Sequence, residues 1–221
     1  MKRYIKHIYM VWRRGRSERR IKVGLITKNQ TEGVTFRYLE DGLKKAIPEG
    51  FTMYPDFPDA QTIYKQNVLE TFAQRLTNTE RSDIKKYYDY WEIAPELKDD
   101  KFYVLAQTQG LLPTDNFEFI AEYYPKKDLK FTSEICGLSY EKVSSGTLSV
   151  GDELTWQLEK NNEYDPYAVL LYKGDTRLGY VKTVHSKIFH DSKYKRFKIV
   201  VKSIEQNGHI NRAFISIYTV S

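Results

Sequence analysis

Residues 151–181 are the stretch that most restricts the fold, because they combine a strand pattern with a polar loop and a hairpin. Leu154, Trp156 and Leu158 alternate with polar residues, which is the period of a strand that buries one face. The sequence Asn-Asn-Glu-Tyr-Asp at 161–165 follows. Asn and Asp side chains bond to nearby backbone and favour turns, so a loop is expected there.

The same stretch continues into a predicted β-hairpin. Lys173-Gly174-Asp175 separates two short runs, Ala168–Leu171 and Arg177–Val181, and this arrangement indicates two strands and a turn. The other strands expected in this half of the chain are Lys130–Tyr140, Arg196–Glu205 and Asn211–Tyr218, the last two joined by a turn at 206–209 that contains Asn207-Gly208. The C-terminal half is therefore predicted to be antiparallel β structure, with one helical turn at His185–Asp191.

Three spaced motifs in this region resemble the HIRAN domain family. They are G-D-x-L at 151–154, N-N-x-Y-D-x-x-A-V at 161–169 and L-G-Y at 178–180. The resemblance covers Phe131 to about Tyr218 and implies a small β-barrel of the OB-like or SH3-like kind. Members of the family occur alone in bacterial and phage proteins and fused to DNA helicases in eukaryotes. The members that bind DNA hold the 3′ end of a single strand.

The resemblance also implies which residues would bind DNA. Tyr140 would stack on a base, and Asp165 would accept a hydrogen bond from the 3′ hydroxyl. Ser139 and Glu163 depart from the family pattern, which has a basic residue and a proline there. The complete set of candidates lies on the first strand, in the polar loop and on the last hairpin strand: Tyr140, Asn161, Asn162, Tyr164, Asp165, Tyr180 and Lys182.

A purely structural interpretation of these residues is also open. Asn and Asp side chains could stabilise the loop so that Ala168 enters the core, and Tyr140 could pack across strands. The loop composition by itself does not separate this interpretation from DNA binding.

The net charge of +6 fits a polyanionic partner, although a basic surface can also serve solubility alone. The densest positive cluster is the stretch 13–20, Arg-Arg-Gly-Arg-Ser-Glu-Arg-Arg, expected at a hairpin tip. Such charges could bind phosphate or protect an edge strand from pairing. The candidate phosphate contacts are Arg13, Arg14, Arg16 and Lys187.

The first half of the chain is predicted to be a β-meander followed by helices, so the fold class is α+β. The expected strands are Tyr4–Trp12, Ile21–Thr27, Val34–Tyr38 and Asn116–Tyr123, and the expected helices are Leu39–Ala46, Gln61–Leu76, Glu80–Ile93 and one that starts at Asp99-Asp100 and stops at Gly110. The region from Ile8 to Gly110, with Phe36-Arg37-Tyr38, resembles the N-terminal subdomain of HipA-type toxin kinases but holds no kinase residues. We expect two domains, 1–124 and 128–221, with a linker at Pro125–Asp128.

No enzymatic activity, cofactor or metal site is expected. The chain has no glycine-rich phosphate loop and no nucleophile elbow, and its four histidines lack zinc-site spacing. Asp175, Asp191 and Lys193 leave open a metal-dependent nuclease, provided that the three converge. The only cysteine, Cys136, indicates a reducing compartment, and no stretch has the pattern of a signal peptide or membrane span, so a cytoplasmic location is expected.

The sequence therefore favours a non-enzymatic DNA-binding protein of bacterial or mobile-element origin. Its HIRAN-like domain would bind single-stranded DNA at 3′ ends. The alternative is a regulatory, antitoxin-like interaction module. In that case the N-terminal domain would bind a protein such as a toxin-like kinase, and the barrel would have lost its DNA pocket.

Overall fold

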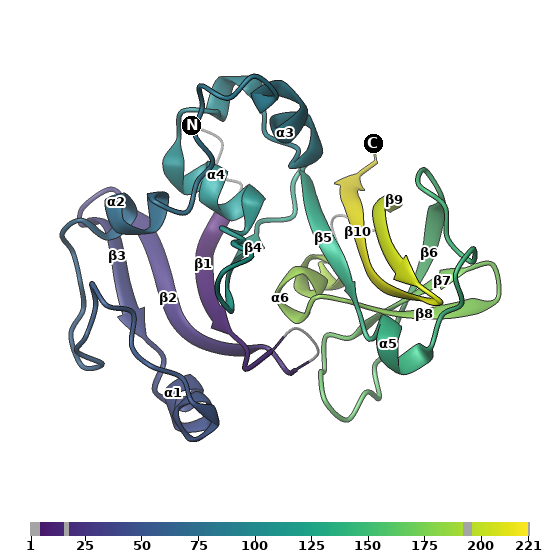
Figure 1. Ribbon diagram of the computed structural model, residues 1–221, viewed down its shortest axis with the longest axis horizontal. Helices are drawn as coiled ribbons and strands as arrows, with labels where there is room; N and C mark the ends of the chain where they lie inside the picture. The colour runs from purple at the N-terminus through teal and green to yellow at the C-terminus, as the bar shows by residue number, and fades with distance from the viewer. Residues whose placement is uncertain (1–4, 16–17, 192–195, 221) are drawn as a thin grey trace. The chain divides into compact units, whose positions relative to one another are not determined.

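The computed structural model describes residues 5–15, 18–191 and 196–220. The chain divides into two compact units, which Figure 1 colours from purple to teal and from teal to yellow. The N-terminal unit comprises the described residues up to Tyr88 together with Ile93–Glu122. The barrel unit comprises Asp89–Glu92 and the described residues from Tyr123 onward. None of the helices in the described ranges is both long and apolar enough to cross a membrane.

The N-terminal unit is built on a four-stranded sheet with the order β3-β2-β1-β4 (Figure 1). The strands are β1 (Ile5–Trp12), β2 (Ile21–Asn29), β3 (Gly33–Tyr38) and β4 (Phe117–Tyr123). The first three form the predicted meander, since β1 pairs antiparallel with β2 and β2 with β3. The helices and 3-10 turns of this unit are α1 (Glu40–Ala46), η1 (Ile47–Glu49), α2 (Val68–Ala73), α3 (Ile84–Tyr90) up to Tyr88, η2 (Pro95–Leu97) and α4 (Lys101–Thr108).

Aromatic rings fill the core of the N-terminal unit. Phe36 on β3 contacts the rings of Tyr38, Phe57 and Phe72 at centroid distances of 4.9, 5.0 and 5.3 Å. The hydroxyl of Tyr38 donates to the carbonyl oxygen of Phe57, which satisfies its polar end inside the core. Burial raises the pKa of Tyr38 to about 12, so the phenol stays neutral. The high tyrosine and phenylalanine content thus serves packing in this unit.

Two helices are shorter than the sequence pattern indicates. The predicted helix Gln61–Leu76 is wrong over its first half, because Tyr64 instead forms a β-bridge with Phe36 and Ile63 is exposed. Asn67, in a left-handed conformation with φ of 54°, delays the helix until Val68. The predicted helix Glu80–Ile93 is reduced to α3 for a similar reason, since Glu92 has a φ of 56°. A single left-handed residue ends a helix, and hydrophobic periodicity does not reveal it.

Helix α4 begins where the two aspartates predicted it, and this provides a test of stability. The Asp100 carboxylate accepts hydrogen bonds from the backbone nitrogens of Phe102 and Tyr103, at 3.0 and 3.2 Å, and also pairs with Lys28. Removal of such a cap costs about 1 kcal/mol. We expect Asp100→Ala to lower the free energy of unfolding by about that amount in urea titrations. Asp100→Asn keeps a capping oxygen and should lose less; an equal loss would contradict the capping role.

The barrel unit is a closed barrel of six strands with the order β10-β5-β8-β7-β6-β9, and every neighbouring pair is antiparallel. Its strands are β5 (Lys130–Cys136), β6 (Glu153–Leu158), β7 (Val169–Lys173), β8 (Thr176–Val181), β9 (Phe197–Asn207) and β10 (His209–Thr219). The helical segments are α5 (Leu138–Glu141), α6 (Thr183–Ser186) and η3 (Lys187–His190). The predicted α+β class, with a meander followed by a small OB-like barrel, is confirmed.

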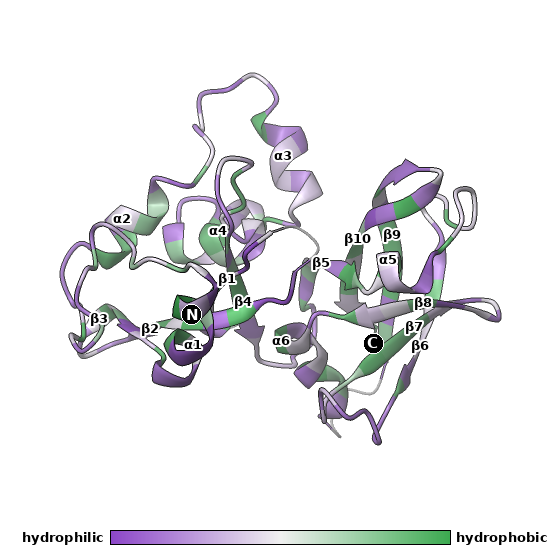
Figure 2. Ribbon diagram, turned by 60° about the horizontal axis from the view of Figure 1, so that its bottom comes forward, coloured by the Kyte–Doolittle hydropathy of each residue, from purple (hydrophilic) through white to green (hydrophobic). Residues whose placement is uncertain are grey.

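Aliphatic and aromatic side chains from all six strands fill the barrel. Fully buried examples include Phe131, Leu171, Leu178, Ile199 and Ile217. Figure 2 shows green segments along the barrel strands, beside purple and white ones. A closed barrel leaves no unpaired edge strand. Most exposed residues of this unit lie in its loops and short helices.

The first barrel strand is shorter than predicted, which changes the setting of Tyr140. The sequence indicated a strand over Lys130–Tyr140, but β5 ends at Cys136. Gly137 follows with a φ of 89° and starts the short helix α5, which holds Tyr140. Tyr140 is 86% exposed, so the alternative in which it packs across strands is wrong.

Candidate nucleic-acid interface

The polar loop between β6 and β7 is held by its own Asn and Asp side chains. The Asn162 Oδ1 atom accepts hydrogen bonds from the backbone nitrogens of Tyr164 and Asp165, both at 3.0 Å. The Asp165 Oδ1 atom accepts from the backbone nitrogen of Tyr167 at 2.9 Å, and the Asp165 carbonyl accepts from Ala168. Ala168 is buried, as the structural interpretation expected. The folded loop also exposes 80% of Tyr164.

Strand β8 contains an irregularity that places two side chains of the candidate site together. Its pairing with β7 skips Leu178, and both Leu178 and Gly179 are buried. Gly179 has a φ of 126°, which suits glycine and disfavours other residues. A bulge of this kind interrupts the alternation of side chains along a strand. Arg177 and Tyr180, three residues apart, therefore meet on the same surface, with the Arg177 Nη2 atom 2.6 Å from the Tyr180 hydroxyl.

A chain of hydrogen bonds then links helix α5 to the polar loop. The Arg177 Nε atom pairs with Glu141 of α5 at 2.8 Å. The Tyr180 hydroxyl donates to Glu159 Oε2 at 2.8 Å, and the Asn162 side-chain amide donates to the same oxygen at 2.5 Å. We call these five residues, Glu141, Glu159, Asn162, Arg177 and Tyr180, the Arg177 cluster. The cluster fixes α5 and the loop beside one another.

The protonation states of the cluster support this arrangement. Hydrogen bonds from Asn162 and then from Tyr180 lower the pKa of Glu159, which is therefore an anion at neutral pH. Burial, followed by the bond to Glu159, raises the pKa of Tyr180, which therefore remains a hydrogen-bond donor. At neutral pH the carboxyl of Glu159 is therefore ionised and the phenol of Tyr180 is protonated, as the hydrogen bonds of the network require.

Two exposed tyrosines flank the Arg177 cluster. Tyr140 precedes Glu141 in α5, and Tyr164 lies two residues after Asn162 in the loop. Neither tyrosine hydroxyl has a hydrogen bond within the described parts of the chain, so both rings are offered to solvent. Asn161, also a predicted site residue, is exposed beside them. The structure thus gathers Tyr140, Asn161, Asn162, Tyr164, Asp165 and Tyr180 on one surface of the barrel.

Lys182 does not belong to this surface. Only 1% of its side chain is exposed, and its Nζ atom pairs with Glu134 at 3.3 Å. Glu134 also accepts from Arg212 at 3.0 Å. The expectation that Lys182 faces the same pocket as Tyr180 is therefore wrong, because the lysine completes a buried ion network instead. Arg177, which the sequence pattern did not single out, is the cation at this surface.

The predicted phosphate contacts lie in different environments in the structure. Arg13 and Arg20 both pair with the buried Glu118, at 3.0 Å each, so these arginines stabilise the sheet. Arg14 is exposed. Arg16 lies outside the described residues. Lys187, in the barrel unit, is half-buried in η3.

Other charged residues near the site were missed for a physical reason. Glu141 and Glu159 belong to the cluster through contacts between segments, and no local motif indicates such pairing. Lys142 follows α5 with a φ of 50°, and Lys160 follows β6. Both lysines are exposed, and no ion pair with another described residue occupies either one. Glu163 and Ser139, the two departures from the family pattern, are exposed as well.

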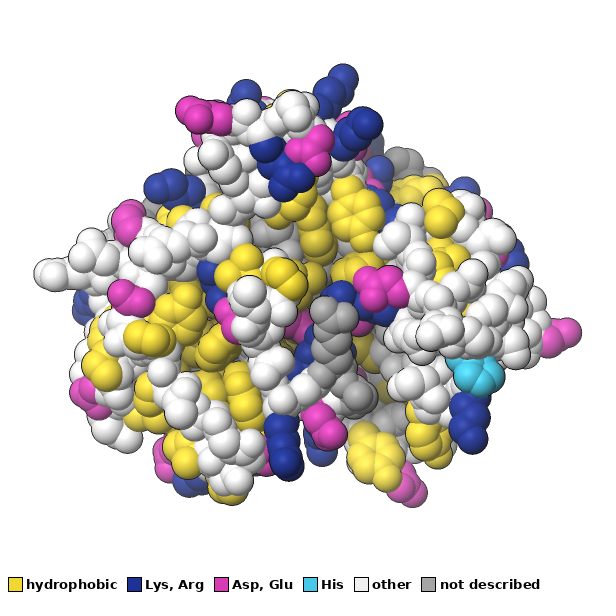
Figure 3. Space-filling view, viewed as in Figure 1, with side chains coloured by type: hydrophobic (Ala, Val, Ile, Leu, Met, Phe, Trp, Pro, Cys, Tyr) yellow, Lys and Arg dark blue, Asp and Glu magenta, His cyan; other side chains and the backbone are white. Residues whose placement is uncertain are grey.

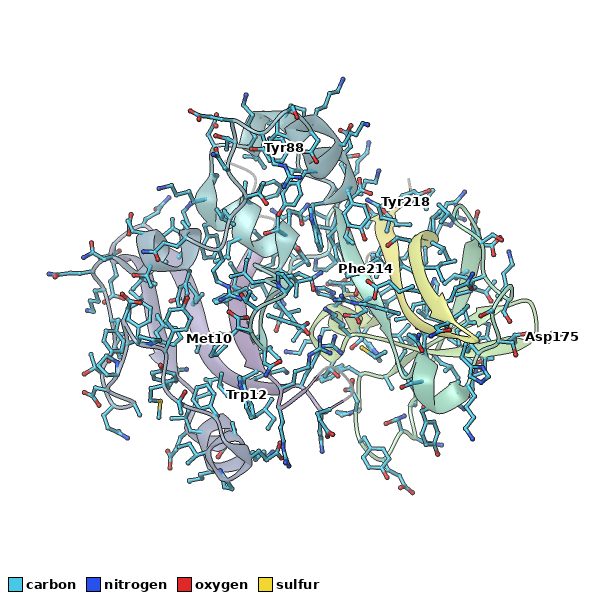
Figure 4. The ribbon with its side chains drawn as sticks, in the orientation of Figure 1. Met10, Trp12, Tyr88, Asp175, Phe214 and Tyr218 are labelled. Atoms are coloured by element: carbon cyan, nitrogen blue, oxygen red, sulfur yellow. The ribbon has the colours of Figure 1, made fainter. Side chains whose placement is uncertain are left out.

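The described residues contain no group of three or more His, Cys, Asp or Glu side chains that could hold a metal ion. Asp175 lies at the tip of the β7–β8 turn, where Figure 4 labels it. Asp191 follows η3, and Lys193 lies outside the described residues. The nuclease alternative thus gains no support from the part of the chain that the structure describes.

Comparison with known proteins identifies the barrel. Residues 129–218 match the family described as HIRAN domain, which confirms the resemblance. The crystal structure of the HIRAN domain of human HLTF is similar with 18% identity and a TM-score of 0.32, covering 40% of this chain and 74% of that one. A protein from Lactobacillus plantarum is similar with 22% identity and a TM-score of 0.33, covering 42% of this chain and 95% of that one. No curated protein matches the chain. A HIRAN domain points to nucleic-acid binding, commonly of single-stranded DNA.

Proposed function

Because residues 129–218 form a HIRAN domain, we propose that this barrel binds single-stranded DNA and holds its 3′ end, without catalysing a reaction. The observation that carries the proposal is the pair of exposed rings, Tyr140 and Tyr164, on the two segments that the Arg177 cluster joins. Large exposed aromatic side chains beside a rigid polar network are typical of a binding surface.

The tyrosines supply affinity that does not depend on base sequence. A base stacked on an aromatic side chain contributes about 1–3 kcal/mol, and every base has a face that can stack. Tyr140 and Tyr164 come from two segments that the Arg177 cluster holds in place. The backbone segments that carry the rings are therefore ordered before DNA binds, which reduces the entropy lost on binding.

The carboxylates supply selectivity for an end. Asp165 uses its Oδ1 atom within the loop, whereas no described residue bonds its Oδ2 atom. A carboxylate oxygen accepts a hydrogen bond from a free hydroxyl but repels a phosphate at the same place. Glu163, exposed two residues earlier, adds to this repulsion. A strand with a 3′ hydroxyl is consequently favoured over one that continues or ends in phosphate.

The exposed lysines supply the salt-dependent part of binding. Lys142 and Lys160 lie next to the segments that carry Tyr140 and the loop, and Arg177 is 42% exposed by its side chain. Contacts of these residues with internal phosphates would release counterions, so affinity would fall with rising salt. Because only a few cations are involved, we expect a shallow salt dependence.

The test is fluorescence anisotropy of labelled single strands that end in a 3′ hydroxyl or a 3′ phosphate. We expect the hydroxyl strand to bind about tenfold more tightly to the wild-type protein. The substitution Asp165→Ala should abolish this preference, because it removes the repelling and accepting carboxylate. Tyr140→Ala and Tyr164→Ala should each weaken both strands by about 5-fold or more, because each removes a stacking surface.

Tyr167→Ala is a matched control, since Tyr167 is an exposed loop tyrosine that contacts His190 and lies outside the cluster. It should leave the end preference intact. Equal binding of both strands by the wild-type protein would reject end capture and leave only a charged surface. No binding of either strand at moderate salt would reject DNA binding by the barrel.

A second candidate function is the regulatory interaction module, antitoxin-like in kind. The observation that favours it is the acidic character of the site, where Arg177 is already paired with Glu141 and bonded to Tyr180. In this alternative the barrel has lost its DNA pocket and the N-terminal unit binds a protein partner. Absence of DNA binding, together with co-purification of one defined protein that the separate N-terminal unit also retains, would support it.

A further inference from the structure

An open pocket lies within the N-terminal unit, among α2, α3, α4 and the segments between them. Its volume is about 470 Å³, which is within the range of small-molecule sites. Helix α2 and the turn after it form one wall, α3 forms the second, and the start of α4 forms the third. The pocket belongs to a different unit from the barrel site, so its ligand does not depend on the proposed role of the barrel.

Half-buried aromatic rings line one wall. Tyr87 and Tyr88 follow one another in α3, with ring centroids 6.2 Å apart and planes inclined by 56°. Figure 4 labels Tyr88 at the position that α3 occupies in Figure 1. Burial and the nearby Asp99 raise the pKa of Tyr88, so its hydroxyl is a donor at neutral pH. The Arg81 guanidinium lies over the Tyr87 ring, 5.9 Å from its centroid, so Tyr88 is the better candidate for stacking and also offers a polar edge.

Uncommitted polar groups line the rest of the pocket. The side chains of Gln74, Thr77 and Thr79 make no hydrogen bond to another described residue. Lys98 and Lys101, from two different segments, likewise have no ion pair within the described ranges. Amide and hydroxyl groups suit the edge of a base, and ammonium groups suit a phosphate. The pocket thus combines the three contacts that a nucleotide requires.

Charged residues of both signs line the pocket, and further lysines lie outside it. Glu70 and Asp99 balance Lys98 and Lys101 inside it, so the lining is close to neutral. Outside it, Lys85 and Lys86 are exposed on α3 just before Tyr87. Figure 3 shows lysine and arginine side chains around α3, with acidic side chains among them. A single phosphate inside and further phosphates along α3 match this distribution.

We propose that this pocket binds one nucleotide of a single-stranded nucleic acid. The base stacks on Tyr88, the amide of Gln74 contacts its edge, and Lys98 and Lys101 hold its phosphate. The neighbouring phosphates run past Lys85 and Lys86. An acidic protein segment would use the lysines but would leave the tyrosine faces and the amide without a function, so a nucleotide accounts for more of the lining.

The test uses the full chain and a short single strand that carries 5-iodouracil, which crosslinks to aromatic side chains on irradiation. We expect crosslinks mapped by mass spectrometry to Tyr87 or Tyr88, in addition to those in the barrel. The double variant Lys98→Glu, Lys101→Glu should reduce the pocket crosslinks about tenfold. The same double variant is also made in a protein that lacks the barrel tyrosines, through Tyr140→Ala and Tyr164→Ala. There it should reduce the magnitude of the slope of log binding constant against log salt concentration by about 0.7 for each phosphate that the protein no longer neutralises.

The matched control is Arg37→Glu with Lys45→Glu, which makes the same change in charge on exposed residues elsewhere in the N-terminal unit. It should leave the pocket crosslinks within about twofold of wild type, because neither residue lines the pocket. Crosslinks confined to the barrel, or an equal loss in both double variants, would overturn the proposal. Binding of a polyglutamate peptide to the pocket in place of the oligonucleotide would do so as well. Pocket crosslinks without barrel crosslinks would reject DNA binding by the barrel while upholding this inference.

Discussion

Gly179→Ala is expected to destabilise the barrel by about 4 kcal/mol and to abolish its surface site. The Cβ atom of alanine would lie 2.2 Å from the carbonyl oxygen of Cys136, which is backbone and has little room to move. The residue also has a φ of 126°, a region that costs other residues about 1–3 kcal/mol. Overpacking in a well-packed interior adds about 1–3 kcal/mol. The measurement is urea unfolding followed by tryptophan fluorescence, with Trp156 as a barrel reporter.

Gly174→Ala is the matched control for this prediction. Gly174 lies in the turn of the same hairpin with a φ of 55°, but no atom lies within 4 Å of the position that a Cβ would take. Gly174→Ala should therefore lower the free energy of unfolding only by the cost of a left-handed backbone conformation, about 1 kcal/mol. If the two substitutions destabilised the barrel equally, the requirement for glycine at position 179 would not come from the close approach of β8 to β5.

Gly179 also connects stability to function, because it lies between the two members of the site on β8. The bulge that skips Leu178 brings Arg177 and Tyr180 together, and the glycine conformation makes the bulge possible. A variant that folds without this geometry should lack the hydrogen bond between the two side chains. The L-G-Y motif is thus explained by backbone geometry as much as by the tyrosine that ends it.

Much of the β structure could be predicted from sequence, because its signals are local. Alternation and turn residues located the meander strands and the hairpins around Gly174 and Gly208, each with a positive φ. The aspartates before α4 located its start through a capping bond that acts within three residues. Where the determinant lies within a few residues, the pattern and the structure agree.

The errors concern contacts between distant segments. Lys182 was expected beside Tyr180 because the family resemblance places both on the hairpin strand that faces the pocket. Glu134, 48 positions earlier in the numbering, instead pairs with it inside the barrel unit. Arg177 was overlooked because strand alternation places it on the face opposite Tyr180, and the bulge reverses that placement. The first half of the helix predicted at Gln61–Leu76 was lost to a backbone pairing with Phe36. Periodicity describes one segment and contains no information about its partner.

The segment Asp89–Glu92 is another feature that periodicity does not predict. It belongs to the barrel unit, although it precedes the expected domain boundary by more than 30 residues. The hydroxyl of Tyr90 lies 2.8 Å from the Ser203 hydroxyl, and the carbonyl of Tyr90 accepts from Thr132 at 3.1 Å and from Lys202. Trp91 packs on Phe214 with ring centroids 5.9 Å apart. Strands β5, β9 and β10 therefore hold this segment through polar and aromatic contacts.

Glu92→Ala should remove the anion on which this attachment depends, and we expect it to lower the free energy of unfolding of the barrel unit by about 3 kcal/mol. Glu92 pairs with Lys202 at 2.6 Å and Lys130 at 2.8 Å and accepts from Ser216 at 3.0 Å. Burial lowers the pKa of Lys202, and Glu92 opposes this effect. Loss of one partner of a buried pair costs about 3–5 kcal/mol, and the half-exposed Lys130 places this case at the lower end. Urea unfolding of the full chain measures the change.

The pH dependence provides an independent test of the same group. Burial alone would raise the pKa of Glu92, but hydrogen bonds from Lys130 and Lys202 outweigh it and lower the pKa below the ordinary value of 4.5. A carboxyl with a lowered pKa in the folded state stabilises fully above its ordinary pKa, and this stabilisation is lost as pH falls through the lowered value. The wild-type barrel should therefore lose more stability than Glu92→Gln between neutral and acidic pH. Lys198→Gln, which removes an exposed ion pair with Glu153, is the matched control and should follow the wild-type profile closely. Parallel profiles for wild type and Glu92→Gln would show that the lysines do not depend on this carboxylate, and the segment would then be held by Tyr90 and Trp91 alone.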